Sequence, residues 1–141
     1  MHNEKSLKPL GQIYLIDSTR YVSVQLLNNG LGPLIIDRLA FKVGNTIYSS
    51  IRDCLTFDPK SYMHGSSEDV VQKVILPNAA LTVFEATLKA GESENNLDQI
   101  RKQLALITVI AHCRDIYDNK IILERSSRWF VRHMLEAAIE S

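Results

Sequence analysis

The chain has 141 residues, of which 45% are hydrophobic and 23% charged, the usual composition of one globular domain with a sizeable core. Its 16 lysines and arginines balance 16 aspartates and glutamates, so there is no excess of positive charge for binding nucleic acid. No apolar run approaches the ~20 residues of a membrane-spanning helix, and residues 1–17 lack the apolar core of a signal peptide. We therefore expect no membrane span in this chain and no nucleic-acid partner.

Two strands are predicted near the N-terminus. Residues 11–17 form a short run that favours β structure. In residues 19–29, Val22, Val24 and Leu26 alternate with polar side chains, which is the period-two pattern of a half-buried strand.

Residues 26–36, LLNNGLGPLII, interrupt an apolar run with Asn28, Gly30, Gly32 and Pro33. A phosphate-binding loop needs GxGxxG or GxxxxGK[ST] leading into a helix, and neither pattern is present. The glycines are expected to supply positive φ, and the proline to fix φ at the start of the next strand. We predict a corner between two strands that binds no ligand.

A third strand and a hairpin follow this corner. Residues 33–43 carry apolar side chains on one parity, with Asp37 as the interruption. Gly44-Asn45 is a hairpin signal that leads into another short strand. The apolar residues of the third strand that share this parity are Ile35, Leu39, Phe41 and Val43.

The middle of the chain has weaker signals. Ser50–Asp53 has capping-box spacing and predicts one or two helical turns. Residues 56–70 are rich in turn formers and are expected to form an exposed loop. Two strands then return, joined by a Pro77-Asn78 turn: residues 70–76 and residues 80–88.

A short helix is predicted next, with Asn95 or Asn96 as its N-cap. Helical spacing predicts that one set of side chains faces the core and another faces water. The first set is Leu97, Ile100 and Leu104, and the second is Asp98, Arg101 and Lys102. Two β-favouring runs then flank Asp115–Asn119, whose side chains suit a tight hairpin connection.

Residues 127–141 are predicted to form a C-terminal helix with one apolar side. A helix this short and this apolar must dock, either on its own domain or on a partner. Its candidate partner surface consists of Trp129, Phe130 and Met134.

Seven or so short strands without β-helix-β alternation predict a mainly β fold, an immunoglobulin-like antiparallel β-sandwich with one or two short helices and the C-terminal helix. We expect a flexible segment over residues 1–10, the sandwich over 11–126, and the helical tail over 127–141. The strand that contains Val24 has no cysteine to pair with Cys113, so the inter-sheet disulfide of true immunoglobulin domains is not implied.

Three motifs within residues 20–125 resemble a pattern in uncharacterised bacterial immunoglobulin-like β-sandwich domains: LLNNGLGPLIIDRLAF, ILPNAALTVFEATL and ITVIAHCRDIYDNKI. Those domains carry an Asn-x-Gly-x-Gly-Pro turn, a proline turn before a strand and an Asp-x-Tyr hairpin. Asn28, Gly30, Gly32 and Pro33 fit the first motif in order, whereas Pro77-Asn78-Ala79 lacks the glycine expected in the second. Such domains are often the soluble part of membrane-associated proteins. The resemblance therefore implies the architecture and an extracytoplasmic setting, and it transfers no catalytic residues.

The cysteines and histidines give no pattern of catalysis. Cys54 and Cys113 form no CxxC motif, and we interpret them as buried thiols, although the sequence leaves a disulfide between them open. His112 and Cys113 are adjacent on a predicted strand, so their side chains point to opposite faces and cannot form a nucleophile-base pair. A pair between His64 and Cys54 has no support in the sequence.

No metal site or cofactor is predicted. The histidines, His2, His64, His112 and His133, lack metal-ligand spacing. The oxygen ligands Asp115, Asp118 and Asn119 lie at one loop tip, but they lack the spacing and the distal glutamate of a calcium loop. We therefore interpret these three residues as formers of an ordinary turn.

Two functions remain. The first is a non-enzymatic interaction module that presents loops or a sheet edge to a protein partner, which includes a second copy in a homodimer. The alternative is a small enzyme or ligand-binding protein with its site in the loop of residues 56–70. That loop carries Asp58, Lys60, Tyr62 and His64. An exposed strand edge favours the first function, and a deep pocket lined by the loop favours the second.

Overall fold

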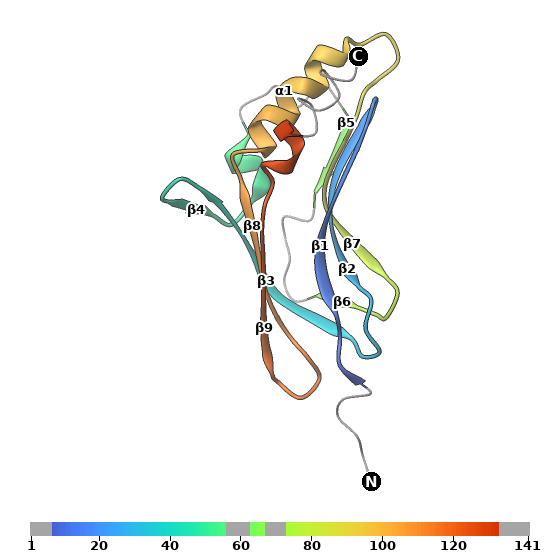
Figure 1. Ribbon diagram of the computed structural model, residues 1–141, viewed down its shortest axis with the longest axis vertical. Helices are drawn as coiled ribbons and strands as arrows, with labels where there is room; N and C mark the ends of the chain where they lie inside the picture. Colours follow the sequence, from blue (N-terminus) through green and yellow to red (C-terminus); the bar gives the residue numbers. More distant parts are fainter. Residues whose placement is uncertain (1–6, 56–62, 67–72, 133–141) are drawn as a thin grey trace.

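The computed structural model describes residues 7–55, 63–66 and 73–132, which form two antiparallel sheets with the core between them (Figure 1). The first sheet has the order β1 (Gly11–Ser18), β2 (Tyr21–Asn28), β7 (Ala80–Thr87) and β5 (Met63–Ser66). The second sheet has the order β4 (Thr46–Tyr48), β3 (Leu34–Val43), β8 (Thr108–Arg114) and β9 (Lys120–Ser126), and β6 (Lys73–Ile75) also pairs with β3. The expected fold class, a mainly β antiparallel sandwich with short helices, is confirmed.

The apolar side chains of β2 are buried as predicted, and Ser23 between them is buried as well. Val22, Val24 and Leu26 of β2 are fully buried, as their period-two spacing predicted. Ser18 pairs with Tyr21, so a tight hairpin joins β1 to β2. Because β2 is the only described strand that pairs with β1, β1 lies at the edge of this sheet.

A bulge at Asp37 shifts the alternation along β3. The pairing with β8 slips between Ile36 and Arg38, so Asp37 is an extra residue in the ladder. The prediction that Ile35 shares the buried face is wrong, because the bulge changes the parity and leaves Ile35 only half-buried. The residues that β3 buries are Leu34 and Ile36 before the bulge and Leu39 and Phe41 after it.

Several predicted turns form where they were expected. Gly44 has a φ of 60° in the β3–β4 hairpin, and Asn78 has a φ of 65° in the turn before β7. The Ser50 hydroxyl accepts a hydrogen bond from the backbone N–H of Arg52 at 3.2 Å and caps the short 3₁₀ helix η2 (Ile51–Cys54). These local signals were therefore sufficient to place the turns.

The region expected to be one exposed loop, residues 56–70, contains a strand. Met63–Ser66 forms β5 and pairs antiparallel with β7, with His64 opposite Ala86. Its sequence, MHGS, has little β propensity, so only the tertiary pairing with β7 explains it. The other positions named in this loop, residues 58, 60 and 62, lie outside the described residues.

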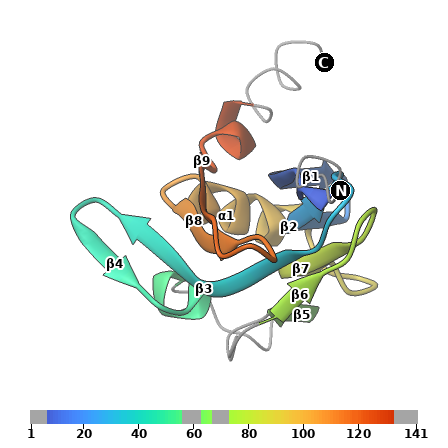
Figure 2. The same ribbon diagram turned by 90° about the horizontal axis from the view of Figure 1, so that it is seen from below.

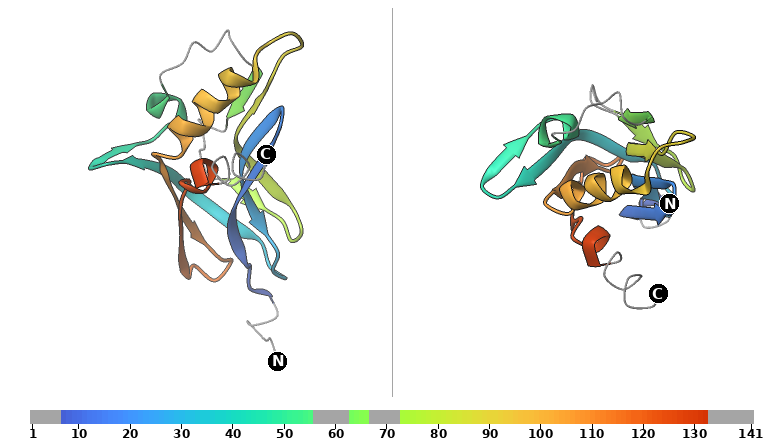
Figure 3. Two further views of the ribbon diagram at one scale, coloured as in Figure 1. Left: turned by 45° about the horizontal axis from the view of Figure 1, so that its top comes forward. Right: turned by 90° about the horizontal axis from the view of Figure 1, so that it is seen from above.

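Helix α1 (Glu94–Leu104) lies across one end of the sandwich (Figure 3). Its N-cap is Ser93, whose hydroxyl accepts from the backbone N–H of Asn95, so the prediction of Asn95 or Asn96 as the cap is wrong by two or three positions. Leu97, Ile100 and Leu104 are buried, as their spacing predicted. Among the described residues, no helix is long and apolar enough to span a membrane.

Arg101 of α1 is buried, although the helical pattern predicted that it faces water. Its Nε donates to Asp17 Oδ1 at 2.8 Å, and its Nη2 donates to the backbone oxygen of Ser18 at 2.6 Å. The side chains of Arg101 and Asp17 are only 8% and 4% exposed. The helix covers the end of the β1–β2 hairpin, and this ion pair joins the two elements.

The predicted corner forms around the buried side chain of Asn28. Its amide nitrogen donates to the backbone oxygens of Gly32 at 2.8 Å and Ile75 at 2.9 Å. Its Oδ1 accepts from the backbone N–H groups of Leu10 at 3.1 Å and Gly30 at 3.0 Å. One neutral side chain thus satisfies four backbone groups from three segments of the chain.

The glycines of the corner are needed for close packing and not for positive φ. The only described glycines with positive φ are Gly44 and Gly91, so our prediction for Gly30 or Gly32 is wrong. A β-carbon at Gly32 would overlap the backbone of Leu7, and one at Gly30 would overlap the backbone around Leu10. Residues 7–10, part of the segment expected to be flexible, are hydrogen-bonded here, for example where Leu31 donates to the backbone oxygen of Lys8 at 2.9 Å.

The tail begins as predicted, with residues 129–132 helical. Phe130 is fully buried in the core, and Trp129 packs against the core with its ring 5.3 Å from that of Phe130. Phe130 is therefore not part of a partner surface, because its own domain already covers it. Position 134 lies outside the described residues.

Candidate functional site

The outward side of the second sheet combines apolar and charged side chains. We call it the outer face and define it by Arg38, Ala40, Lys42, Ile47, Ile110, His112, Ile122 and Glu124. On a sheet with one buried side, the outward positions are usually polar. Here Ile47 is 64% exposed and Ile122 is 66% exposed. Two isoleucines on one open face are the strongest departure from this pattern among the described strands.

The pairing of the strands brings these residues together. Ala40 lies opposite Ile110, and Arg38 lies opposite His112 on β8. His112 in turn lies opposite Ile122 on β9. The outer face is therefore a continuous surface across three strands.

The β3–β4 hairpin extends this surface beyond the sandwich, where Figure 2 shows it projecting to one side. Ile47 lies opposite Lys42 near the tip, and the turn is formed by Gly44 in the left-handed region. Tyr48, the next residue, points to the other side and packs against the core. The sheet thus curves around a hollow between the hairpin and β8.

This hollow has a volume of about 450 Å³. It opens on the outer face, and its walls come from β3, β4, the residue after β4, and β8. The lining residues are Arg38, Leu39, Ala40, Ile47, Tyr48, Ser49, Ile110 and His112. A shallow site of mixed apolar and polar character suits an inserted side chain of a protein better than a reaction centre.

Two arginines lie beside the apolar part of the outer face. Arg38 Nη2 lies 3.4 Å from Nε2 of His112. At one end of the face, Arg114 donates to Asp37 at 3.1 Å and to Asp118 at 2.8 Å, and these hydrogen bonds raise its pKa above the ordinary value. Arg114 is therefore a permanent cation that already has two carboxylate partners.

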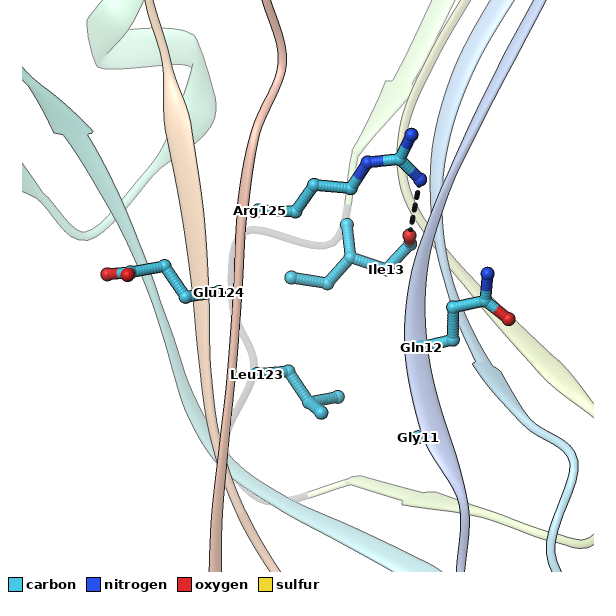
Figure 4. Close-up of a pocket in the computed structure, with 6 residues that line it drawn as sticks. All are labelled: Gly11, Gln12, Ile13, Leu123, Glu124 and Arg125. Atoms are coloured by element: carbon cyan, nitrogen blue, oxygen red, sulfur yellow. Dashed lines mark hydrogen bonds between the residues drawn. The ribbon is translucent and has the colours of Figure 1, made fainter. Parts of the chain in front are cut away.

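A second hollow lies in the seam between β1 and β9, the facing edges of the two sheets (Figure 4). It has a volume of about 300 Å³ and includes Gly11, Gln12 and Glu124 in its lining. Figure 4 shows Arg125 reaching from β9 to β1, where its Nη1 donates to the backbone oxygen of Ile13 at 3.0 Å. This hydrogen bond occupies a main-chain oxygen of the edge strand β1 and links that strand to β9.

The Asp115–Asn119 turn uses its oxygen ligands internally. The buried Asp115 carboxylate accepts from the backbone N–H groups of Tyr117 at 2.8 Å and Asn119 at 2.9 Å, and from the side-chain amide of Asn119. Desolvation raises the pKa of Asp115, but these hydrogen bonds outweigh it, and the net shift is downward. The described residues contain no cluster of three or more side chains that could hold a metal ion.

The two cysteines are free thiols in the structure. Desolvation, and then the charge of Asp53, raises the pKa of Cys54 to about 11. Desolvation, and then the charge of Asp37, does the same for Cys113. Both are therefore protonated at neutral pH, which makes them poor nucleophiles. Cys113 points into the core while His112 lies on the outer face, as predicted.

The sequence contained a signal for the outer face that we missed. The apolar triplets Val109-Ile110-Ala111 and Ile121-Ile122-Leu123 break period-two alternation on both of the last strands. A strand that faces water on one side does not need an apolar residue at the middle position of such a triplet. The triplets thus indicate an apolar face on each side of the sheet.

No known protein-family model matches this sequence, and no curated protein matches it. Among solved structures, the chain is similar to the archaellum periplasmic stator protein FlaG from Sulfolobus acidocaldarius. The identity is 12% and the TM-score is 0.34, over 84% of this chain and 98% of that chain. A likeness this slight supports no statement about function, which has to be inferred from the geometry of the chain itself.

Proposed function

We propose that this chain is a non-enzymatic interaction module that binds a protein partner through its outer face. The observation that carries the proposal is the exposure of Ile47 and Ile122, 64% and 66%, on a face that a solvated sheet would keep polar. Burial of an isoleucine side chain contributes about 1.5–3 kcal/mol, so a partner that covers both would gain a substantial part of its binding energy there.

The surroundings of the hollow support a protein partner. Its lining combines the apolar residues Ala40 and Ile110 with the polar residues Arg38 and His112. Interfaces of this kind place an apolar anchor in the centre and polar groups at the rim. The partner is expected to insert an apolar side chain into the hollow and to place acidic or neutral polar groups against the rim.

The order of the strands supports an immunoglobulin-like assignment. The order β1-β2-β7-β5 corresponds to the ABED sheet of that class, and β3-β8-β9 corresponds to its CFG sheet, with β4 as an added neighbour. Sandwiches of this class commonly serve as binding modules on many unrelated proteins. An extracytoplasmic setting, which the resemblance of the sequence motifs implies, belongs to the same proposal.

The proposal is tested by affinity co-purification with the immobilised full chain from an extract of its source cells. Ile47→Glu places a charge in the centre of the outer face, whereas Leu31→Glu makes the same kind of change at the corner, where Leu31 is 70% exposed. We expect the wild type and Leu31→Glu to retain the same partner and Ile47→Glu to lose it by about tenfold or more. Equal retention by the two variants would contradict the proposal.

A further inference from the structure

The last strand of the second sheet, β9, has an open edge. Within the described part of the chain, β8 is the only strand that pairs with β9. Their register is regular from the pair Thr108 and Ser126 to the pair Arg114 and Lys120. One side of the main chain of β9 is therefore available to another strand.

The register identifies which residues face this edge. Beyond one end of the ladder, the N–H of Ser127 donates to the oxygen of Ile107 at 2.9 Å, and at the hairpin end the N–H of Asp115 donates to the oxygen of Asn119 at 3.1 Å. Hydrogen-bonded and non-hydrogen-bonded pairs alternate in an antiparallel ladder. The even-numbered residues of β9 are thus the non-hydrogen-bonded ones, and their N–H and C=O groups point away from β8. These residues are Lys120, Ile122, Glu124 and Ser126.

The same four residues direct their side chains to the solvent. All four are exposed, while Ile121, Leu123 and Arg125 between them are half-buried on the inner side. The open edge therefore presents one positive, one apolar and one negative side chain in sequence, spaced two residues apart: Lys120, Ile122 and Glu124. When two such strands run antiparallel, the lysine of each lies opposite the glutamate of the other, and the two isoleucines lie opposite each other.

We propose that β9 pairs antiparallel with β9 of a second copy of this chain, about a twofold axis at Ile122. Ile122 then lies opposite Ile122 of the other copy, and Lys120 lies opposite Glu124 on each side. The N–H and C=O groups on the open edges of the two β9 strands then form the hydrogen-bonded pairs of a new ladder. The second sheet of one copy and the second sheet of the other become one continuous sheet. Directly opposite ion pairs and apolar pairs both stabilise an antiparallel sheet.

The charges select this register over its neighbours. In the adjacent registers, Ile122 lies opposite Glu124 or opposite Lys120, and both ion pairs are lost. In the next registers, Glu124 lies opposite Glu124 or Lys120 lies opposite Lys120, which places like charges together. On the inner side, the proposed register puts Leu123 opposite Ile121 of the other copy, so two half-buried apolar side chains gain a contact. A second copy is therefore a better occupant of this edge than an unrelated strand.

This inference shares Ile122 and Glu124 with the outer face, but it involves neither Ile47 nor the hollow, so it can be tested separately from the proposed function. The test is sedimentation equilibrium of the full chain over a range of concentrations, with the variants Lys120→Glu and Glu124→Lys. Each single variant places like charges at both contacts of its own dimer. We expect each to weaken self-association by about tenfold or more.

An equal mixture of the two single variants is the decisive sample. In a mixed pair, Glu at 120 and at 124 of one chain faces Lys at 124 and at 120 of the other, so both ion pairs form again. We expect the mixture to associate about as strongly as the wild type. Lys42→Glu, a change of the same charge on exposed β3, serves as the matched control and should leave self-association unchanged.

A further variant tests the main chain. Ile122→Pro removes only an N–H that points to the open edge, so the fold is expected to tolerate it while self-association is lost. A wild type that stays monomeric at every concentration would overturn the inference. So would single variants that associate like the wild type, or a mixture that does not recover. Any of these results would remove only the β9 dimer. The proposed function would still stand if Ile47→Glu loses the protein that the wild type retains in the co-purification.

Discussion

The corner around Asn28 and the outer face of the second sheet differ in how their chemical groups are used. At the corner, the side-chain amide of Asn28 is buried and makes four hydrogen bonds, and the glycines leave room only for the neighbouring backbone. On the outer face, Ile47 and Ile122 are mostly exposed, and the edge groups of β9 have no strand partner in the described residues. The corner has the more conspicuous sequence motif, yet its groups are all used by the fold itself. Groups that the fold leaves unused are better evidence for binding than an unusual motif.

Replacement of Asn28 should have the largest effect. Asn28→Ala removes four hydrogen bonds at once, two of them buried, from backbone groups of Leu10, Gly30, Gly32 and Ile75. We expect a loss of about 2–4 kcal/mol in the free energy of unfolding, measured by urea denaturation. Asn29→Ala, which changes the exposed neighbour, is the control and should cost less than about 0.5 kcal/mol. Similar losses for the two variants would show that the corner does not depend on Asn28.

A side chain at Gly32 should have the next largest effect. The β-carbon of Gly32→Val would overlap the backbone of Leu7, so residues 7–10 must move away from the corner. We expect a cost of about 1–3 kcal/mol, measured by thermal or urea denaturation. Leu31→Ala, at the exposed position between the two glycines, is the matched control. An unchanged stability of Gly32→Val would contradict the close packing.

The Asp115 turn predicts an acid dependence of stability. The pKa of Asp115 is lower in the folded chain than its ordinary value of about 3.9, so its contribution is fully present above that value and is lost as the pH falls through the folded pKa. Asp115→Asn should therefore lower the melting temperature near neutral pH by more than it does in acid. Melting curves of both proteins from neutral pH to pH about 2 measure this difference. Parallel curves over the whole range would contradict the assignment.

Polar replacements on the outer face should have the smallest effect on stability. Ile122→Ser removes an apolar side chain that is 66% exposed, and we expect a change within about 0.5 kcal/mol in the monomer. Ile36→Ser makes the same substitution at a fully buried position of the same sheet and should cost several times more. Urea denaturation at low protein concentration measures both. A large loss for Ile122→Ser would mean that this residue supports the fold and is not reserved for binding.

Local patterns in the sequence were enough to predict most of the strands, several turns and the mainly β sandwich. Val22, Val24 and Leu26 alternate as expected, and the Gly44 and Pro77-Asn78 turns lie where their chemistry placed them. What could not be predicted depends on contacts between distant segments. Arg101 has the helical phase of a solvent-facing residue, but Asp17, far away in sequence, draws it into the interior. β5 forms only because β7 is beside it.

The candidate site was harder to predict for the same reason. Ile47, Ile110 and Ile122 lie on three different strands, and only the register of the sheet places them on one face. The bulge at Asp37 changes which residues of β3 share that face, whereas the sequence marked Asp37 only as an interruption of the apolar pattern. The candidate partner residue Phe130 was misassigned because its apolar character fits the core as well as it fits an interface. The free edge of β9 became visible only with the hydrogen-bond pattern of the ladder.

Residue-resolved amide hydrogen exchange of the full chain, at low and at high protein concentration, tests the central claim most directly. We expect slow exchange at both concentrations for the hydrogen-bonded amides of Asn29 and Leu31 at the corner. The edge amides of Ile122 and Glu124 should exchange quickly in dilute solution and slowly in concentrated solution, while Leu123, which is bonded to β8, stays protected throughout. Edge amides that are already protected in the dilute chain, or that exchange at the same rate at both concentrations, would contradict a β9 edge left open for binding.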